Sequence, residues 1–163
     1  MEQVLTQPIG LKHVMKVEIR TALETDMADI QLCAQLAYTR YVQRMGKEPA
    51  PMHADFARQI AQGCVDVAIS ESRVVGYVVS YPEDSKFSLE SVAVLPEYSG
   101  RGIGKRLIEH VENTAKNTGC ETVELYTNEA MVENISMYPK MGYVEVSRRR
   151  EDGFNRVFFR KQL

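Results

Sequence analysis

Residues 97–107 read EYSGRGIGKRL, with glycine at positions 100, 102 and 104 and two cations at the head of an apolar helical pattern. The run just before it, SVAVLP over residues 91–96, is typical of a strand that ends at a proline. Beyond it, apolar residues recur every fourth position from Ile103 to Ala115, which predicts a helix that ends near Gly119. A strand, a glycine-rich turn and a helix direct unpaired backbone N–H groups toward the positive end of the helix dipole. This arrangement binds anions.

Two familiar phosphate motifs do not fit this loop. A P-loop needs Ser or Thr after its lysine, but Arg106 follows Lys105, and Ser99 stands where the first glycine belongs. The dinucleotide fingerprint fails as well, because neither Gly100 nor Gly102 begins a run with glycine at its third and sixth positions. What remains is a general anion cradle, in which glycines allow close approach to the backbone.

The rest of the chain alternates between helical and extended patterns. Strands are expected over residues 16–22, 64–70, 73–82, 87–96, 120–127, 143–149 and 156–163, and helices over residues 30–45, 55–63, 103–119 and 133–142. Pro49 and Pro51 are expected to force an extended segment between the first two helices. The three consecutive strands from residue 64 to residue 96 have short turns between them, which predicts an antiparallel meander.

The composition is that of an ordinary globular domain. Of the 163 residues, 44% are hydrophobic and 26% are charged, and the formal net charge is −2. This charge gives no case for a nucleic-acid partner, and no apolar run predicts a membrane span. Three widely spaced cysteines indicate neither disulfides nor zinc, and we expect a cytoplasmic protein without a metal. We expect one domain over residues 15–163 after a loosely ordered leader, residues 1–14.

Two segments together resemble a known family. The run SVAVLPEYSGRGIGKRLIEHV, residues 91–111, is similar to motif A of the GNAT acetyltransferase superfamily, whose loop reads Gln/Arg-x-x-Gly-x-Gly/Ala. The run NISMYPKMGYVEV, residues 134–146, resembles the Asn and Tyr-x-x-x-Gly-Phe/Tyr segment of that family. The element order also agrees over residues 16–161. One departure is Ser99, which stands at the Gln/Arg position.

The resemblance implies an α/β (α+β) single-domain acyltransferase fold. Such a fold has a mixed central sheet of about seven strands, with an antiparallel N-terminal meander, flanked by about four helices. The implied function is transfer of an acetyl group from acetyl-coenzyme A directly to a primary amine of a small molecule or peptide. The cofactor-binding residues carried over by the resemblance are Val92, Ala93, Val94, Gly100, Arg101, Gly102, Ile103, Gly104, Lys105 and Asn134, with Asn128 as an alternative to Asn134.

The resemblance also implies catalytic residues. Tyr138 matches the general acid of the family, which protonates the departing thiolate, although a core aromatic residue is the competing interpretation. Glu90 is the first candidate for the base, against a solvated glutamate, Glu124 or a chain of water molecules. A base is needed because a lysine-like amine is neutral in only about one molecule per thousand at a pH of about 7.5.

The acceptor side is less well defined. The resemblance places it near Tyr38, Tyr41 and Arg44, the segment 47–52 and the turn 151–155, although core packing or solvation explains these side chains equally well. Two other functions stay open: a non-catalytic coenzyme A sensor or partner-binding module, and a toxin-type enzyme that acts on charged transfer RNA. A homodimer could form through the last strand, residues 156–163.

Overall fold

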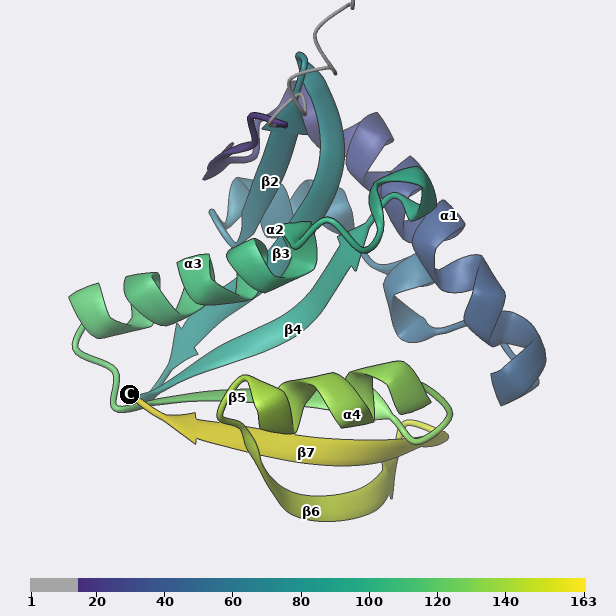
Figure 1. Ribbon diagram of the computed structural model, residues 1–163, viewed down its shortest axis with the longest axis vertical. Helices are drawn as coiled ribbons and strands as arrows, with labels where there is room; N and C mark the ends of the chain where they lie inside the picture. Colours follow the sequence, from purple (N-terminus) through teal and green to yellow (C-terminus); the bar gives the residue numbers. More distant parts are fainter. Residues whose placement is uncertain (1–14) are drawn as a thin grey trace, which may run out of the picture.

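The computed structural model describes residues 15–163, which build one seven-stranded sheet with helices on both faces (Figure 1). The strands are β1 (Glu18–Thr21), β2 (Val65–Ser70), β3 (Arg73–Glu83), β4 (Lys86–Val94), β5 (Thr122–Asn128), β6 (Val144–Glu151) and β7 (Phe154–Gln162). The helices are α1 (Met27–Met45), α2 (Phe56–Ala61), α3 (Ile103–Asn117) and α4 (Val132–Lys140), with 3-10 turns at Glu24–Asp26, Ala50–His53 and Pro96–Tyr98. The predicted element order and the predicted mixed sheet are confirmed.

The sheet is divided by a splay between its two central strands. Its strand order is β1-β2-β3-β4-β5-β7-β6, and every neighbouring pair is antiparallel except β4 and β5. These two strands pair in parallel only over Lys86–Leu89 and Thr122–Leu125. Figure 1 shows them side by side at one end and diverging toward the other. The backbone edges beyond Leu89 therefore face a gap instead of a neighbouring strand.

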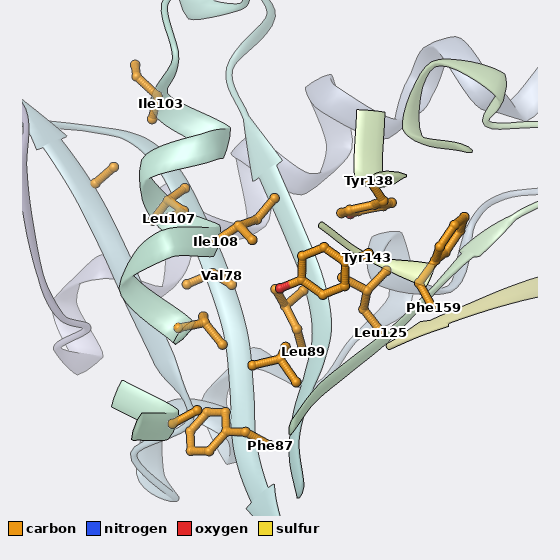
Figure 2. Packing of buried hydrophobic residues seen from close by; sticks show 14 of the residues in the cluster. Val78, Phe87, Leu89, Ile103, Leu107, Ile108, Leu125, Tyr138, Tyr143 and Phe159 are labelled. Atoms are coloured by element: carbon orange, nitrogen blue, oxygen red, sulfur yellow. The ribbon is translucent and has the colours of Figure 1, made fainter. Parts of the chain in front are cut away.

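Side chains alternate between the two faces of the sheet and form two cores. In β3, Val78 belongs to the core beneath α3, whereas its neighbour Tyr77 belongs to the core beneath α1 and α2. Figure 2 shows the first core, where Leu107 and Ile108 of α3 lie against Val78. The sheet is thus packed on both faces, and the gap between β4 and β5 lies within it.

Three further expectations have different outcomes. The segment after Pro49 is not extended but forms the 3-10 turn Ala50–His53, because proline can occupy the start of a helical turn, where no N–H donor is needed. Strand β7 is not an edge strand, since it lies between β5 and β6, so the predicted dimer edge at residues 156–163 is wrong. The predicted leader, residues 1–14, lies outside the described residues. No helix within residues 15–163 has both the length and the apolar character of a membrane span.

Candidate functional site

The glycine-rich loop leaves a run of backbone donors without partners. Gly100 and Gly102 have φ of 75° and 80°, left-handed values that a β-carbon would oppose, and Gly102 is the N-cap of α3. The first N–H to enter the helical ladder is that of Arg106, which donates to the Gly102 carbonyl oxygen at 3.1 Å. Within residues 15–163, no acceptor receives a hydrogen bond from the N–H groups of residues 100–105. The loop can therefore bind an anion through its backbone.

This loop borders a groove of about 440 Å³ that runs along β4 to α4. Nine of the residues expected to bind the cofactor line it: Val92, Ala93, Val94, Gly100, Gly102, Ile103, Gly104, Lys105 and Asn134. Ser99 lines it too, so at the position where the family has a long side chain the groove is bounded by a short hydroxyl. Arg101 differs from the expectation. Its guanidinium lies 5.1 Å from the Tyr98 ring, and its side chain lines a separate pocket, because Met15 and Tyr98 hold it there.

The outer edge of β4 supplies a second set of donors. Strand β4 forms its ladder to β3 through alternate residues, among them Leu95, whose N–H donates to Val75 at 2.8 Å. Val92 and Val94 alternate with these residues, so their N–H and C=O groups point away from β3. Because β5 has already diverged at Leu89, these groups face the gap.

A smaller cavity of about 60 Å³ lies on the other side of this gap. Residues from both strands of the splay line it, together with Met45, Pro49, Ala50 and Pro51 and the turn residue Phe154. The expectation that the segments 47–52 and 151–155 border the acceptor side agrees with this lining. Four residues line both the groove and the cavity: Tyr38, Val92, Asn134 and Tyr138. The two spaces therefore meet at these side chains.

Tyr138 combines the two interpretations made from the sequence. Its ring is 3% exposed and packs against Tyr143 and Phe159, with ring centroids 5.7 and 5.6 Å away (Figure 2). Its hydroxyl makes no hydrogen bond with any group in residues 15–163, yet it is not among the fully enclosed polar atoms without a partner. Burial raises the pKa of this hydroxyl well above the usual value, so it keeps its proton at neutral pH. The ring is thus part of the core, and the residue also lines both the groove and the small cavity.

Tyr38 is fixed at the same junction from the opposite side of the sheet. It comes from α1, and its hydroxyl donates a hydrogen bond to the Val92 carbonyl oxygen at 2.9 Å. This contact occupies the Val92 carbonyl, and no group within residues 15–163 accepts a hydrogen bond from the N–H of the same residue on that edge.

Glu90 lies at a β-bulge. In the β3–β4 register Val79 pairs with Ser91 and Ser80 pairs with Leu89, so Glu90 has no partner and its strand bends at that point. Its carboxylate accepts hydrogen bonds from Gln59 Nε2 at 2.6 Å and from the Tyr81 hydroxyl at 3.4 Å. It lines the small cavity, as a base for an incoming amine must.

Glu124, the reserve candidate for the base, is used elsewhere. Its carboxylate forms ion pairs with Lys86 at 2.9 Å and with Arg160 at 2.6 Å. It lines neither the groove nor the cavity. Desolvation opposes ionisation of this carboxyl, but the hydrogen bonds from Lys86 and Arg160 lower its pKa. Lys86 and Arg160 thus occupy this carboxylate at the closed end of the splay, away from both spaces.

The two asparagines have different positions. Asn134 donates from Nδ2 to Thr127 Oγ1 at 3.2 Å and lies at the junction of the two spaces. Asn128 accepts a hydrogen bond from the Ala130 N–H at 2.9 Å and lines the small cavity instead of the groove. Of the two alternatives for binding the cofactor, Asn134 is therefore the one that borders the groove.

Two of the three residues expected to contact the acceptor do not line the small cavity. Tyr41 lines the groove. Arg44 lines neither space, and two of its nitrogens bind the Glu133 carboxylate at 2.8 Å. The hydrogen bond from Arg44 lowers the pKa of Glu133 to about 2. This ion pair ties α1 to α4.

One charged residue of the small cavity was missed from the sequence. Arg156 of β7 has a side chain only 8% exposed, and its guanidinium carbon lies 4.3 Å from the Tyr126 ring centroid and 5.5 Å from that of Phe154. In the sequence it alternates with Val157 and reads as an outward-facing residue of a strand. Tyr126 of β5, one of the two rings that it contacts, comes from a neighbouring strand, which the periodicity of β7 does not reveal.

Comparisons with known proteins agree with this geometry. The sequence profile of the acetyltransferase (GNAT) family matches residues 29–143. Mouse thialysine N-epsilon-acetyltransferase is 33% identical over 76 residues, which cover 44% of this chain and 45% of that protein. The [ribosomal protein bS18]-alanine N-acetyltransferase of Salmonella typhimurium is 25% identical over 81 residues, which cover 50% and 55%. The chain spans about half the length of the curated relatives it matches.

A solved structure shares the fold over almost the whole chain. The PaiA N-acetyltransferase of Thermoplasma acidophilum, in complex with coenzyme A, superimposes with a TM-score of 0.79 at 20% identity. The match covers 91% of this chain and 100% of that chain. At 20% identity this similarity supports the fold alone.

Proposed function

Because the chain belongs to the GNAT acetyltransferase family, we propose that it transfers the acetyl group of acetyl-coenzyme A directly to a primary amine of a small molecule or peptide. The observation that carries this proposal is the junction at Val92 and Tyr138, where a groove suited to a phosphorylated donor meets a separate small cavity. A donor and an acceptor that enter from opposite sides can react only at such a point.

The groove fits the donor. The N–H groups of residues 100–105, at the positive end of α3, would hold the pyrophosphate. The N–H and C=O groups of Val94 would pair with the amide groups of the pantetheine arm, as a neighbouring strand would. The Val92 N–H would stabilise negative charge that develops on the carbonyl oxygen. Acetyl-coenzyme A itself supplies the activated acetyl group.

Glu90 is the residue we propose to accept a proton from the amine, directly or through water. Supplying the neutral form of a lysine-like amine at neutral pH costs about 4 kcal/mol without a base. Gln59 and Tyr81 hold the carboxylate of Glu90 in place by hydrogen bonds, so its oxygens are oriented before the amine arrives. The bulge at Glu90 is what turns this side chain into the cavity.

Tyr138 is the residue we propose to return a proton, to the sulfur that leaves the acetyl group. Its hydroxyl has no competing partner in residues 15–163 and remains protonated because burial raises its pKa. When the carbon–sulfur bond breaks, the thiolate takes the proton of the hydroxyl oxygen. Solvent can then restore the proton through the groove.

Calorimetric titration with acetyl-coenzyme A, followed by an assay of thiol release with a panel of primary amines, tests the proposal. We expect donor binding in the micromolar to millimolar range and amine-dependent release of the thiol. Glu90→Gln should bind the donor normally and turn over about 100-fold more slowly, as for loss of a general base. Donor binding without turnover on any amine would favour the non-catalytic coenzyme A module instead.

A further inference from the structure

The small cavity carries one charge of each sign. Among its lining residues in the described part of the chain, Glu90 and Arg156 are the two that are charged at neutral pH, and Leu89, Pro51 and Phe154 belong to its apolar walls. Tyr126 lines the same cavity. Burial raises the pKa of its hydroxyl, the positive charge of Arg156 opposes that rise and the negative charge of Glu90 adds to it. Both charged groups of the cavity therefore act on this hydroxyl.

The guanidinium of Arg156 keeps hydrogen-bond donors that bind no acceptor within residues 15–163. Only its Nη1 is engaged, with Glu151 at 2.9 Å and Asp152 at 3.4 Å. Nε and Nη2 donate no hydrogen bond within residues 15–163, and neither is among the enclosed atoms left without a partner, so solvent reaches both. These two nitrogens form one edge of the guanidinium, whose parallel N–H groups match the two oxygens of a carboxylate.

The guanidinium lies against residues of the small cavity. Tyr126 and Phe154, the rings that it contacts, both line the small cavity. Asn128 is the register partner of Arg156 and lines the same cavity. The Oδ1 of Asn128 already accepts the Ala130 N–H, so its Nδ2 is the group that remains to donate.

Arg156 has a structural role through one side of its guanidinium. Glu151, the last residue of β6, and Asp152 of the following turn have side chains 41% and 78% exposed, and both accept hydrogen bonds from Nη1. These contacts leave the Nε and Nη2 edge, which solvent reaches, open to an acceptor of hydrogen bonds that displaces this solvent.

We propose that the acceptor amine carries a carboxylate, which Nε and Nη2 of Arg156 bind while the amino group lies between Glu90 and Tyr138. The acceptor is thus an amino acid or a related zwitterion with a small apolar body, which matches the two charged groups and the apolar walls of the cavity. A phosphate dianion fits less well, because Glu151 and Asp152 already share the charge of Arg156 and Glu90 adds a negative charge to the same cavity. This inference rests on the proposed function, since it assigns the acceptor of that reaction.

The experiment compares acceptors that differ only in the carboxylate. The pairs are glycine and glycinamide, L-alanine and L-alaninamide, and 4-aminobutyrate and 4-aminobutanamide, which suit a cavity of about 60 Å³, assayed with the parent, Arg156→Gln and Arg156→Lys. Arg150→Gln is the matched control, because Arg150 is an arginine of the neighbouring strand β6 that does not line the cavity. Thermal unfolding of each variant checks that it is folded.

For at least one pair, we expect the parent to prefer the acid over the amide in kcat/KM. Arg156→Gln should reduce that preference on the order of 10- to 100-fold, the loss of a charge-assisted hydrogen bond. Comparing the preference between variants cancels the different basicity of the two amines. Arg156→Lys should restore part of the preference, and Arg150→Gln should retain all of it.

The outcomes separate this inference from the proposed function. Turnover of acids and amides with a preference that Arg156→Gln does not change would overturn the carboxylate site and leave the acetyltransferase standing. Calorimetry with the coenzyme A complex supplies the other readout. Acids that bind through Arg156 without being acetylated would keep the carboxylate site and remove the proposed function. Absence of both binding and turnover for every pair overturns the inference.

Discussion

Tyr138 and Tyr143 allow a test in which two neighbouring hydroxyl groups are removed one at a time. Their ring centroids are 5.7 Å apart, and both rings belong to the same core. The Tyr143 hydroxyl donates to the Glu112 carboxylate at 3.1 Å, whereas the Tyr138 hydroxyl has no partner in residues 15–163. Changing each to phenylalanine keeps the ring and its packing. The two variants should therefore differ in what they lose.

The magnitudes follow from these contacts. Tyr143→Phe removes a buried hydrogen bond to a charged acceptor, which should lower the free energy of unfolding by about 1.5 to 3 kcal/mol. For a chain of this size that corresponds to a fall in Tm of roughly 3 to 12 °C. Tyr138→Phe breaks no hydrogen bond, so we expect its stability to stay within about 0.5 kcal/mol of the parent. Its kcat should fall about 100- to 10,000-fold, since the variant lacks the general acid.

Two assays on the same preparations are sufficient. Thermal unfolding measures stability, and thiol release from acetyl-coenzyme A with a saturating amine measures kcat. Because the hydroxyl acts on the leaving sulfur, Tyr138→Phe should bind acetyl-coenzyme A with an unchanged Kd in calorimetry. A Tyr138→Phe variant with parental kcat would refute the assignment of the acid. A large loss of stability in that variant would refute the statement that its hydroxyl has no structural partner.

Two further predictions concern the donor loop and the first helix. Gly102→Ala and Gly119→Ala replace glycines with φ of 80° and 78° and open space around the added methyl, so each should lose about 1 to 2 kcal/mol of stability. Only Gly102→Ala should also raise the Kd for acetyl-coenzyme A, by about tenfold or more, and equal Kd values in the two variants would contradict the backbone cradle. Asp26→Asn should destabilise the protein at neutral pH, because hydrogen bonds from Arg20 at 2.7 Å and from the Leu23 N–H hold the pKa of Asp26 below its usual value against desolvation. A carboxyl whose folded pKa is depressed stabilises the fold above its unfolded pKa, so in urea unfolding between pH 2 and 7 the difference from the parent should vanish as the pH falls through the folded value.

Local patterns in the sequence were enough to predict the elements of the fold. A strand repeats its environment every second residue and a helix about every 3.6 residues. The strands between Val65 and Val94 and the helix from Ile103 to Ala115 could therefore be predicted from their apolar patterns. The loop between them was equally readable, because left-handed φ at Gly100 and Gly102 is a property of the glycines themselves. The groove is built largely from these contiguous residues, and nine of the residues expected to bind the cofactor line it.

The acceptor half was harder to predict because partners from distant segments decide it. Arg44 and Glu133 are 89 residues apart in the chain, and Arg44 binds Glu133 instead of lining the small cavity. The sequence shows Glu124 only as a carboxylate on a strand, and its ion pairs with Lys86 and Arg160 are seen only in the structure. In each case the residue type was right for the chemistry, and the neighbour that neutralises it was not visible in the local sequence.

The splay between β4 and β5 explains why the two halves differ in this respect. Where the strands part after Leu89, each must satisfy its exposed edge by other means, and the bulge at Glu90 lies at the first position beyond the last pair. The cavity opened there is walled by β7 and its turn only because Asn128 of β5 pairs with Arg156. A shift of this register by one residue would place Val157 at the cavity and turn Arg156 to the opposite face. The charge that we assign to acceptor recognition is therefore fixed by strand register, which no local pattern in residues 120–163 specifies.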